Sequence, residues 1–348
     1  MVVTLITAVS ARPSREDERS EPTMSSTLHH DGVAPEEPNL RPGRVVVGIS
    51  NRDESYDRSL LAAEAWAARR QLDVELVVGL GRGDRTSAEG ADDRARLVRS
   101  EIGAAADHLA LQLEPAQRVH TSISELSGVD ALLAASGGAG VVVLQRRRLG
   151  PLARIRAGST SALVAARAAC PVLIVHPDDP APASEGTRPG ILVGVDPRGH
   201  AAHAIAEAFA EASWRDVPLT AVLASEPPGP TFVPPGPSET EFLHASAAAE
   251  LAEQLAGHCE QYPEVEVHQS VLWGRAAPVL ADLSVRYELL VVARHTEGHR
   301  GKRNLGSESR RLLEEAHCSV LITPTSRPTP VARHRHAAMT STPPPTSP

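Results

Sequence analysis

The sequence predicts an α/β protein of two tandem Rossmann-like domains, each a five-stranded parallel sheet with helices on both faces. Short aliphatic segments alternate with helix-length segments, which is typical of βαβ units. Landmarks of the first half recur in the second at an offset of 146 to 148 residues, which indicates a duplication. Aromatic residues make up only 3% of the chain, so the cores must consist mainly of the aliphatic side chains typical of buried parallel strands.

Each half opens with an aliphatic strand and closes with a Gly-Ser pair, a helix and a second aliphatic strand. The matching landmarks are Val45–Ile49 with Ile191–Val195, Gly158-Ser159 with Gly306-Ser307, and Cys170 with Cys318. Because the offset stays nearly constant over all of them, we expect both halves to share one topology.

Segments rich in proline and polar residues set the domain boundaries. Residues 1–43 and 325–348 are predicted to be disordered tails, and residues 177–189 are predicted to be a linker. Domain 1 then spans residues 44–176 and domain 2 spans residues 190–324.

Strands and helices alternate within each domain. In domain 1 we expect strands at residues 44–49, 73–79, 118–123, 140–144 and 171–175. In domain 2 we expect strands at residues 190–195, 217–224, 264–272, 288–293 and 319–323, and helices at 200–213, 238–261, 275–286 and 306–317. A parallel sheet of this kind binds ligands beyond the carboxyl ends of its strands, where the strand order reverses.

Composition excludes several classes of protein. The formal net charge of −8 argues against a general nucleic-acid binder. Three cysteines without a Cys-x-x-Cys pair predict neither a disulfide nor a zinc site, and favour a reducing cytoplasm. No apolar segment approaches the ~20 residues of a membrane span. Residues 2–9 are apolar but lack a basic start, so we expect no signal peptide, and translation starts at Met1 or Met24.

The loop after the fourth strand carries the most informative motif. In domain 2 it runs Ala293-Arg294-His295-Thr296, then nine residues, then Gly306-Ser307. In domain 1 it runs from Gln145 to Arg148 and reaches Gly158-Ser159 at the same distance. A Gly-Ser pair that opens a helix offers free N–H groups and a positive dipole end to an anion. The alternative is that both pairs are only good helix starts.

In this loop the chain resembles the universal stress proteins, whose ATP-binding members carry Gly-x2-Gly-x9-Gly-Ser/Thr here. The resemblance covers about residues 44–176 and 190–324. Both halves keep the last Gly-Ser but not the first two glycines. Ala293 and Thr296 are mild replacements, whereas Gln145 and Arg148 are large. If these positions need φ > 0, threonine is strained there.

The resemblance also implies an aspartate near the adenosine, at the end of the first strand, where domain 2 has Asp196. A turn former before Pro197 is the alternative interpretation. Gly274 and Pro278 match the family pattern as well. If ATP binds, we therefore expect it in domain 2. The candidate residues are Asp196, Ala293, Arg294, Thr296, Gly306 and Ser307.

Both loops are basic in an acidic chain. The cations are Arg146, Arg147, Arg148, Arg154 and Arg156 in domain 1, and Arg294, Arg300, Lys302 and Arg303 in domain 2. Arginines beside helix N–H groups can bind phosphate without glycines. A solvated loop is the alternative interpretation.

The predicted function is a non-enzymatic stress-response regulator with an adenine-nucleotide site in domain 2. One alternative is an interaction module that has lost nucleotide binding and docks an acidic protein partner through its basic loops. An ATP hydrolase is a further alternative. We identify no catalytic residue, because no Ser-His-Asp or Cys-His arrangement follows from the spacing. His295 and His299 lack a third partner, so no metal site is predicted.

The last strands of the two halves define the expected assembly. They are bare aliphatic edges, which favour pairing, and universal stress proteins commonly dimerise through this strand. We predict an internal pseudo-dimer in which Val172–Val175 lies close to Val320–Ile322 while each domain keeps a separate sheet. A separately expressed half is then expected to dimerise through the same edge.

Overall fold

The computed structural model describes residues 43–49, 57–81, 88–146, 160–178, 190–225, 237–297 and 304–325. Almost all of the predicted tails and most of the predicted linker lie outside these residues. The same is true of residues 147–159 and 298–303, which include most of both basic loops.

Domain 1 alternates strands and helices as predicted. Its elements are β1 (Arg44–Gly48), α1 (Asp57–Arg70), β2 (Val74–Gly79), α2 (Ala88–Gln112), β3 (Val119–Ser124), α3 (Gly128–Ser136), β4 (Ala139–Gln145), α4 (Thr160–Arg167) and β5 (Val172–Val175). β1 through β4 pair only in parallel, as βαβ units require.

Domain 2 repeats this order and adds one short strand pair. Its elements are β6 (Ile191–Val195), α5 (Ala202–Arg215), β7 (Leu219–Ser225), α6 (Pro237–Gln261), β8 (Val267–Trp273), α7 (Ala276–Ser284), β9 (Leu289–Ala293), β10 (Thr296–Glu297), β11 (Asn304–Leu305), α8 (Ser307–Glu315) and β12 (Ser319–Thr323). The small antiparallel pair β10–β11 interrupts the loop between β9 and α8.

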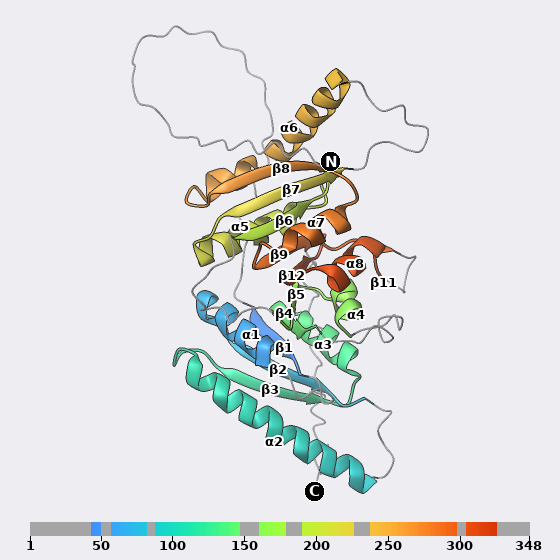
Figure 1. Ribbon diagram of the computed structural model, residues 1–348. Coiled ribbons are helices and arrows are strands. Elements are labelled where there is room, and N and C mark those ends of the chain that lie inside the picture. Colours follow the sequence, from blue (N-terminus) through green and yellow to red (C-terminus); the bar gives the residue numbers. More distant parts are fainter. Residues whose placement is uncertain are drawn as a thin grey trace, which may run out of the picture.

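The two halves share one ten-stranded sheet, in the order β3-β2-β1-β4-β5-β12-β9-β6-β7-β8 (Figure 1). Within each half the strands are parallel. β5 and β12 join the halves as an antiparallel pair, with Leu173 opposite Leu321. The predicted contact between the terminal strands is therefore confirmed, but the expectation of two separate sheets is wrong. The physical reason is that two bare aliphatic edges satisfy their backbone hydrogen bonds by pairing with each other.

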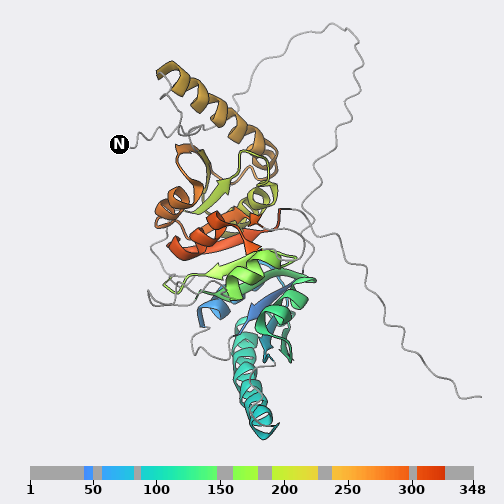
Figure 2. The same ribbon diagram turned by 90° about the vertical axis from the view of Figure 1, so that its right-hand side faces the viewer.

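Helices cover both faces of this sheet. α1, α2, α5 and α6 pack on one face, and α3, α4, α7 and α8 pack on the other. The long helices α2 and α6 lie at opposite ends of the molecule (Figure 2). No helix among the described residues is long and apolar enough to cross a membrane.

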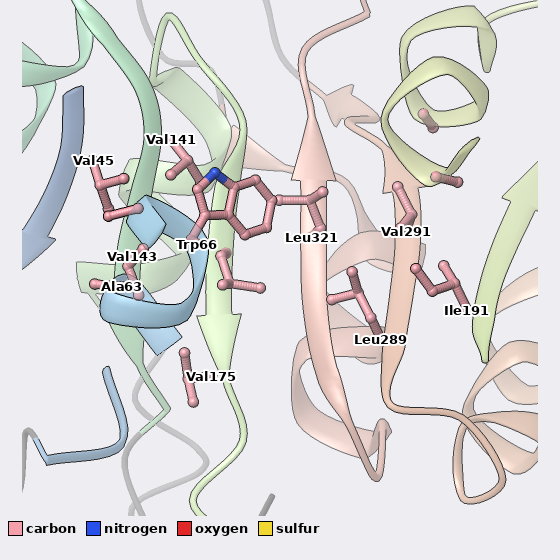
Figure 3. Close-up of a cluster of buried hydrophobic side chains, with 14 of the residues drawn as sticks. Val45, Ala63, Trp66, Val141, Val143, Val175, Ile191, Leu289, Val291 and Leu321 are labelled. Atoms are coloured by element: carbon pink, nitrogen blue, oxygen red, sulfur yellow. The ribbon is translucent and has the colours of Figure 1, made fainter. Parts of the chain in front are cut away.

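Alternate strand residues face alternate cores. Val45 and Val47 belong to the core under α1 and α5, whereas Val46 belongs to the core under α3 and α7. Each core continues from one half into the other. Trp66 of α1 and Leu321 of β12 belong to the same buried cluster (Figure 3). The two domains therefore share both hydrophobic cores.

Candidate functional site

The strand order of domain 2 reverses between β6 and β9. These strands pair in parallel, with Gly194 opposite Val292 near their carboxyl ends. From β6 the chain continues outward to β7, whereas β9 is followed on its other side by β12. The segments that leave β6 and β9 therefore begin side by side, and this pair of segments is the expected ligand crevice. Asp196 and Arg294 are the first residues beyond the two strands.

Asp196 organises the turn between β6 and α5. Its carboxylate accepts a hydrogen bond from the backbone N–H of Arg198 at 2.8 Å, and lies 3.4 Å from Nδ1 of His200. Its backbone carbonyl accepts from the N–H of Gly199 at 3.1 Å. These contacts agree with the turn-forming interpretation of Asp196. The side chain remains 34% exposed, so it is partly accessible to solvent.

The residues that replace the family glycines are ordinary extended residues. Ala293 ends β9 opposite Thr323, and Thr296 pairs with Leu305 in the β10–β11 hairpin. Among the described residues other than glycine, only Gln71 and Asp216 have positive φ. The predicted strain at Thr296 is therefore absent, because neither position adopts the left-handed backbone that favours glycine.

A glycine is required at position 306 because the backbone there lies close to His295. Its φ of −60° suits any residue. Its N–H donates to the carbonyl oxygen of His295 at 2.8 Å. A Cβ atom on Gly306 would lie 2.8 Å from Cδ2 of the His295 ring, closer than real Cβ contacts. The start of α8 is thereby held against the end of β9. Ser307 is the first residue of α8, and the Gly306 cap provides no side-chain hydrogen bond.

The side chain of Arg294 contacts domain 1 across the domain boundary. Its Nη1 donates to the carbonyl oxygen of Ala168, at the end of α4 in domain 1, at 2.8 Å. Arg146, the equivalent residue of domain 1, donates to the carbonyl oxygens of Ala316 and Glu314 at the end of α8. Each arginine thus supplies a cation to the negative carboxyl end of a helix in the other half. These contacts do not support the predicted role of Arg294 in neutralising phosphate. The other loop cations lie outside the described residues.

A cavity of about 480 Å³ lies between β7, α7 and α8. It is lined by Ala224, Gly274, Arg275, Ala276 and Glu308. Gly274 has a φ of +143°, a conformation that other residues rarely adopt, so a glycine is required at the entrance to α7. None of the six predicted site residues lines this cavity, although Glu308 directly follows Ser307.

Glu308 places a negative charge at the start of α7. Its Oε2 accepts a hydrogen bond from the N–H of Ala277 at 2.8 Å, and its Oε1 forms an ion pair with Arg275. Arg275 is the N-cap residue of α7 but forms no capping hydrogen bond itself. A carboxylate from α8 therefore caps α7, using the donors with which helix starts bind phosphate. In domain 1, Ser127 caps the equivalent helix α3 from within its own segment.

The sequence did not point to Arg275 and Glu308. Gly274 matched the family pattern, but an acidic residue in the first turn of a helix is common enough to carry no signal. The contact becomes visible only once α7 and α8 are packed together, since the two residues are 33 positions apart. The described residues include no group of three or more His, Cys, Asp or Glu that could hold a metal ion.

A family model for the universal stress protein family matches residues 42–176 and again residues 189–324. The chain belongs to the universal stress protein family. A universal stress protein of Mycolicibacterium smegmatis is 35% identical over 210 residues, which cover 59% of this chain and 68% of the relative. Universal stress protein Rv2005c of Mycobacterium tuberculosis is 36% identical over 231 residues, which cover 64% and 75%.

Solved structures of the family share this fold. A universal stress protein from Archaeoglobus fulgidus aligns with a TM-score of 0.60 at 13% identity, covering 82% of this chain and 97% of that one. A universal stress protein in complex with cAMP covers 40% of this chain with a TM-score of 0.31, a likeness that carries no argument about the site. The family and the tandem α/β fold thus rest on agreement between sequence and structure.

Proposed function

We propose that this universal stress protein is a non-enzymatic regulator that binds an adenine nucleotide, with ATP as the first candidate, in the crevice of domain 2. One observation carries the proposal. The starts of α7 and α8 lie together beside the crevice and next to a cavity of about 480 Å³, and one of these starts already binds a carboxylate. A pair of helix N-termini provides the N–H donors and the positive potential that phosphate requires.

The donor set fits an anionic nucleotide. The backbone N–H groups after Gly306 and the N-terminus of α7 would hold phosphate oxygens, and Arg275 would add a charge-assisted contact. The partly exposed side chain of Asp196 would accept a hydrogen bond from a ribose hydroxyl, as the family resemblance implies. Glu308 opposes this arrangement, because its carboxylate occupies the donors of α7. Binding therefore requires phosphate to displace or outweigh that carboxylate, which limits the affinity.

The alternative of a module that docks an acidic partner through its basic loops is not favoured. The described cation of each loop, Arg146 or Arg294, donates to the opposite domain. The absence of catalysis and a cytoplasmic location remain parts of the proposal. The three cysteines are free thiols in the structure.

Thermal-shift and turnover measurements on the full chain test this function. We expect ATP to raise the melting temperature at millimolar concentration. Inorganic phosphate alone should raise it less, since only ATP carries a ribose that can contact Asp196. No ATP should be consumed above the buffer rate. Equal shifts with ATP and phosphate would reject the nucleotide site, and nucleotide turnover would reject the non-enzymatic role.

A further inference from the structure

A buried group of charged and aromatic side chains crosses the boundary between the two domains. It lies where the ends of α1 and α5 meet above the β5–β12 pair. The guanidinium of Arg70 stands between two indole rings, 3.9 Å from the centroid of Trp66 and 3.9 Å from the centroid of Trp214. Trp66 belongs to domain 1 and Trp214 to domain 2, so the cation joins both domains through its two faces.

Glutamates of domain 2 complete the contact. Arg70 Nη2 lies 2.7 Å from Oε1 of Glu211 and 3.3 Å from Oε2 of Glu207. Arg215, on the same helix as both acids, lies 2.6 Å from the other oxygen of Glu211 and 2.9 Å from Glu288. The side chain of Glu211 is 1% exposed and that of Arg70 is 10% exposed. These charges are therefore desolvated and depend on one another.

Arg69 adds a third cation to the group. Burial, followed by the neighbouring charge of Arg215, lowers the pKa of Arg69 to about 10, and Glu211 acts in the opposite direction. Arg69 stays protonated at neutral pH. Three arginines thus face three glutamates, and the charges balance. The members are Arg69, Arg70, Arg215, Glu207, Glu211 and Glu288.

The group is not symmetric between the repeats. Gln71 and Asp216, both with a φ of 53°, end α1 and α5 at the same place, which fixes the equivalence of the two helices. Counting back from them, Arg70 is equivalent to Arg215. Trp66 stands at the position of Glu211, and Ala62 stands at the position of Glu207. Domain 1 therefore contributes cations, and domain 2 contributes all three glutamates.

Two further kinds of contact at the boundary are symmetric. The β5–β12 pair centres on Leu173 and Leu321, which are equivalent residues. The arginine contacts of Arg146 and Arg294 to helix ends are also equivalent. These contacts would form equally well between two copies of the same domain, so they cannot choose a partner.

We propose that the buried charge group makes the pairing surface heterotypic: domain 1 fits domain 2, from its own chain or from a second copy, and neither domain fits a copy of itself. Two copies of domain 2 would bring six glutamates and two arginines of this group together. Two copies of domain 1 would bring four arginines and no glutamate at the equivalent positions. Either pairing would leave like charges buried against each other, which strongly disfavours the contact. This proposal replaces the expectation that a separated half dimerises with itself.

Two full-length variants test the proposal by reversing one side of the group at a time. The first carries Arg69→Glu and Arg70→Glu, so that both of its domains are acidic at the boundary. The second carries Glu207→Arg and Glu211→Arg, so that both of its domains are basic. Both chains carry the same Gly/Ser insertion within residues 181–188, so that the linker does not limit exchange between chains. A third chain combines all four substitutions and restores the charge balance.

Native mass spectrometry of the mixed chains gives the decisive result. We expect the first two variants, mixed one to one, to form a complex of twice the chain mass that contains one copy of each. This complex should exceed dimers of either single variant by about tenfold or more. The combined chain should stay monomeric and melt at least as high as the two single-sided variants. The matched neutral pair, Arg69→Gln with Arg70→Gln and Glu207→Gln with Glu211→Gln, should form less mixed complex than the charge-reversed pair, because its single chains bury unpaired charges rather than like charges at the boundary.

Two outcomes would overturn the proposal. If the single-sided variants remain monomeric and as stable as the parent chain, the charges do not control the boundary. If the combined chain is rescued but the mixture contains no mixed complex, the group stabilises the boundary without selecting its partner.

Discussion

At the scale of single residues, we expect Glu308 to limit how tightly the proposed site binds an anion. Its carboxylate takes the N–H of Ala277 and the guanidinium of Arg275, both of which a phosphate would use. Glu308→Gln removes the negative charge but keeps an oxygen that can accept the same bond. We therefore expect the variant to bind ATP about three- to tenfold more tightly, because one opposing charge is worth roughly 1 kcal/mol at such a position.

Isothermal titration calorimetry measures this change, and Glu314→Gln provides the control. Glu314 lies on the same helix with an exposed side chain. The control should leave ATP affinity unchanged apart from a small effect of net charge. Equal or weaker binding by Glu308→Gln would show that Glu308 does not oppose the nucleotide.

Gly306 has a steric role that the sequence did not predict. Its Cβ position is blocked by the ring of His295, so Gly306→Ala must displace the β9 loop. We expect a loss of about 1–3 kcal/mol in the free energy of unfolding, as for other overpacked sites. Gly257→Ala, in α6 with open space around it, should instead be neutral or stabilise by about 0.5–1 kcal/mol. Chemical denaturation compares the two, and equal effects would remove the steric explanation.

At the scale of elements, the reciprocal arginines connect each loop to a helix of the other domain. Arg294→Gln removes the cation from the end of α4, and Arg146→Gln removes it from the end of α8. Each change should cost about 1–2 kcal/mol of unfolding free energy. Neither should change ATP affinity more than the exposed control Arg286→Gln, because both guanidiniums serve the boundary. A selective loss of ATP binding in Arg294→Gln would instead restore the predicted phosphate role.

The contact between α1 and α5 gives a stability change that depends on pH. Burial raises the pKa of Glu211, but the guanidiniums of Arg215, Arg70 and Arg69 outweigh it and leave the pKa below its usual 4.5. This contribution is present above pH 4.5 and disappears as the pH falls through the lowered folded-state value. Glu211→Gln should cost about 3–5 kcal/mol at neutral pH because it leaves Arg70 and Arg215 without their shared acid.

Urea denaturation from pH 7 down to pH 3 checks this behaviour. The difference between the parent chain and Glu211→Gln should shrink as the solution becomes more acidic. A difference that stays constant over this range would mean that the substitution acts through packing alone.

At the scale of the whole molecule, local periodicity and repetition were sufficient to predict the strands and helices and their order, but not that the two domains share one sheet. The strand expected at residues 171–175 is β5, at Val172–Val175, and the helix expected at 306–317 is α8, at Ser307–Glu315. Such elements are encoded by short aliphatic runs and helix starts, which are local in the sequence. The hairpin of β10 and β11 was missed because two-residue strands leave no periodic pattern.

The site could be predicted only in part, and the reason is again physical. Asp196 and Gly306 do lie at the crevice, because the topology of parallel sheets places strand ends together. The partner of Arg294 is a carbonyl 126 residues away, and the partner of Arg275 belongs to another helix. The sequence shows the charge of a side chain but not which group it contacts. Helix ends and acids from distant segments therefore changed the roles of these arginines.

The proposed adenine-nucleotide site of this universal stress protein lies in domain 2, between β6, β9 and the starts of α7 and α8. Photolabelling of the full chain with an azido-adenine analogue of ATP, followed by peptide mapping, tests it most directly. We expect labelled peptides from the segments that follow β6, β7 and β9, with labelling suppressed by excess ATP. Labelling confined to domain 1, or no labelling that ATP can suppress, would contradict it.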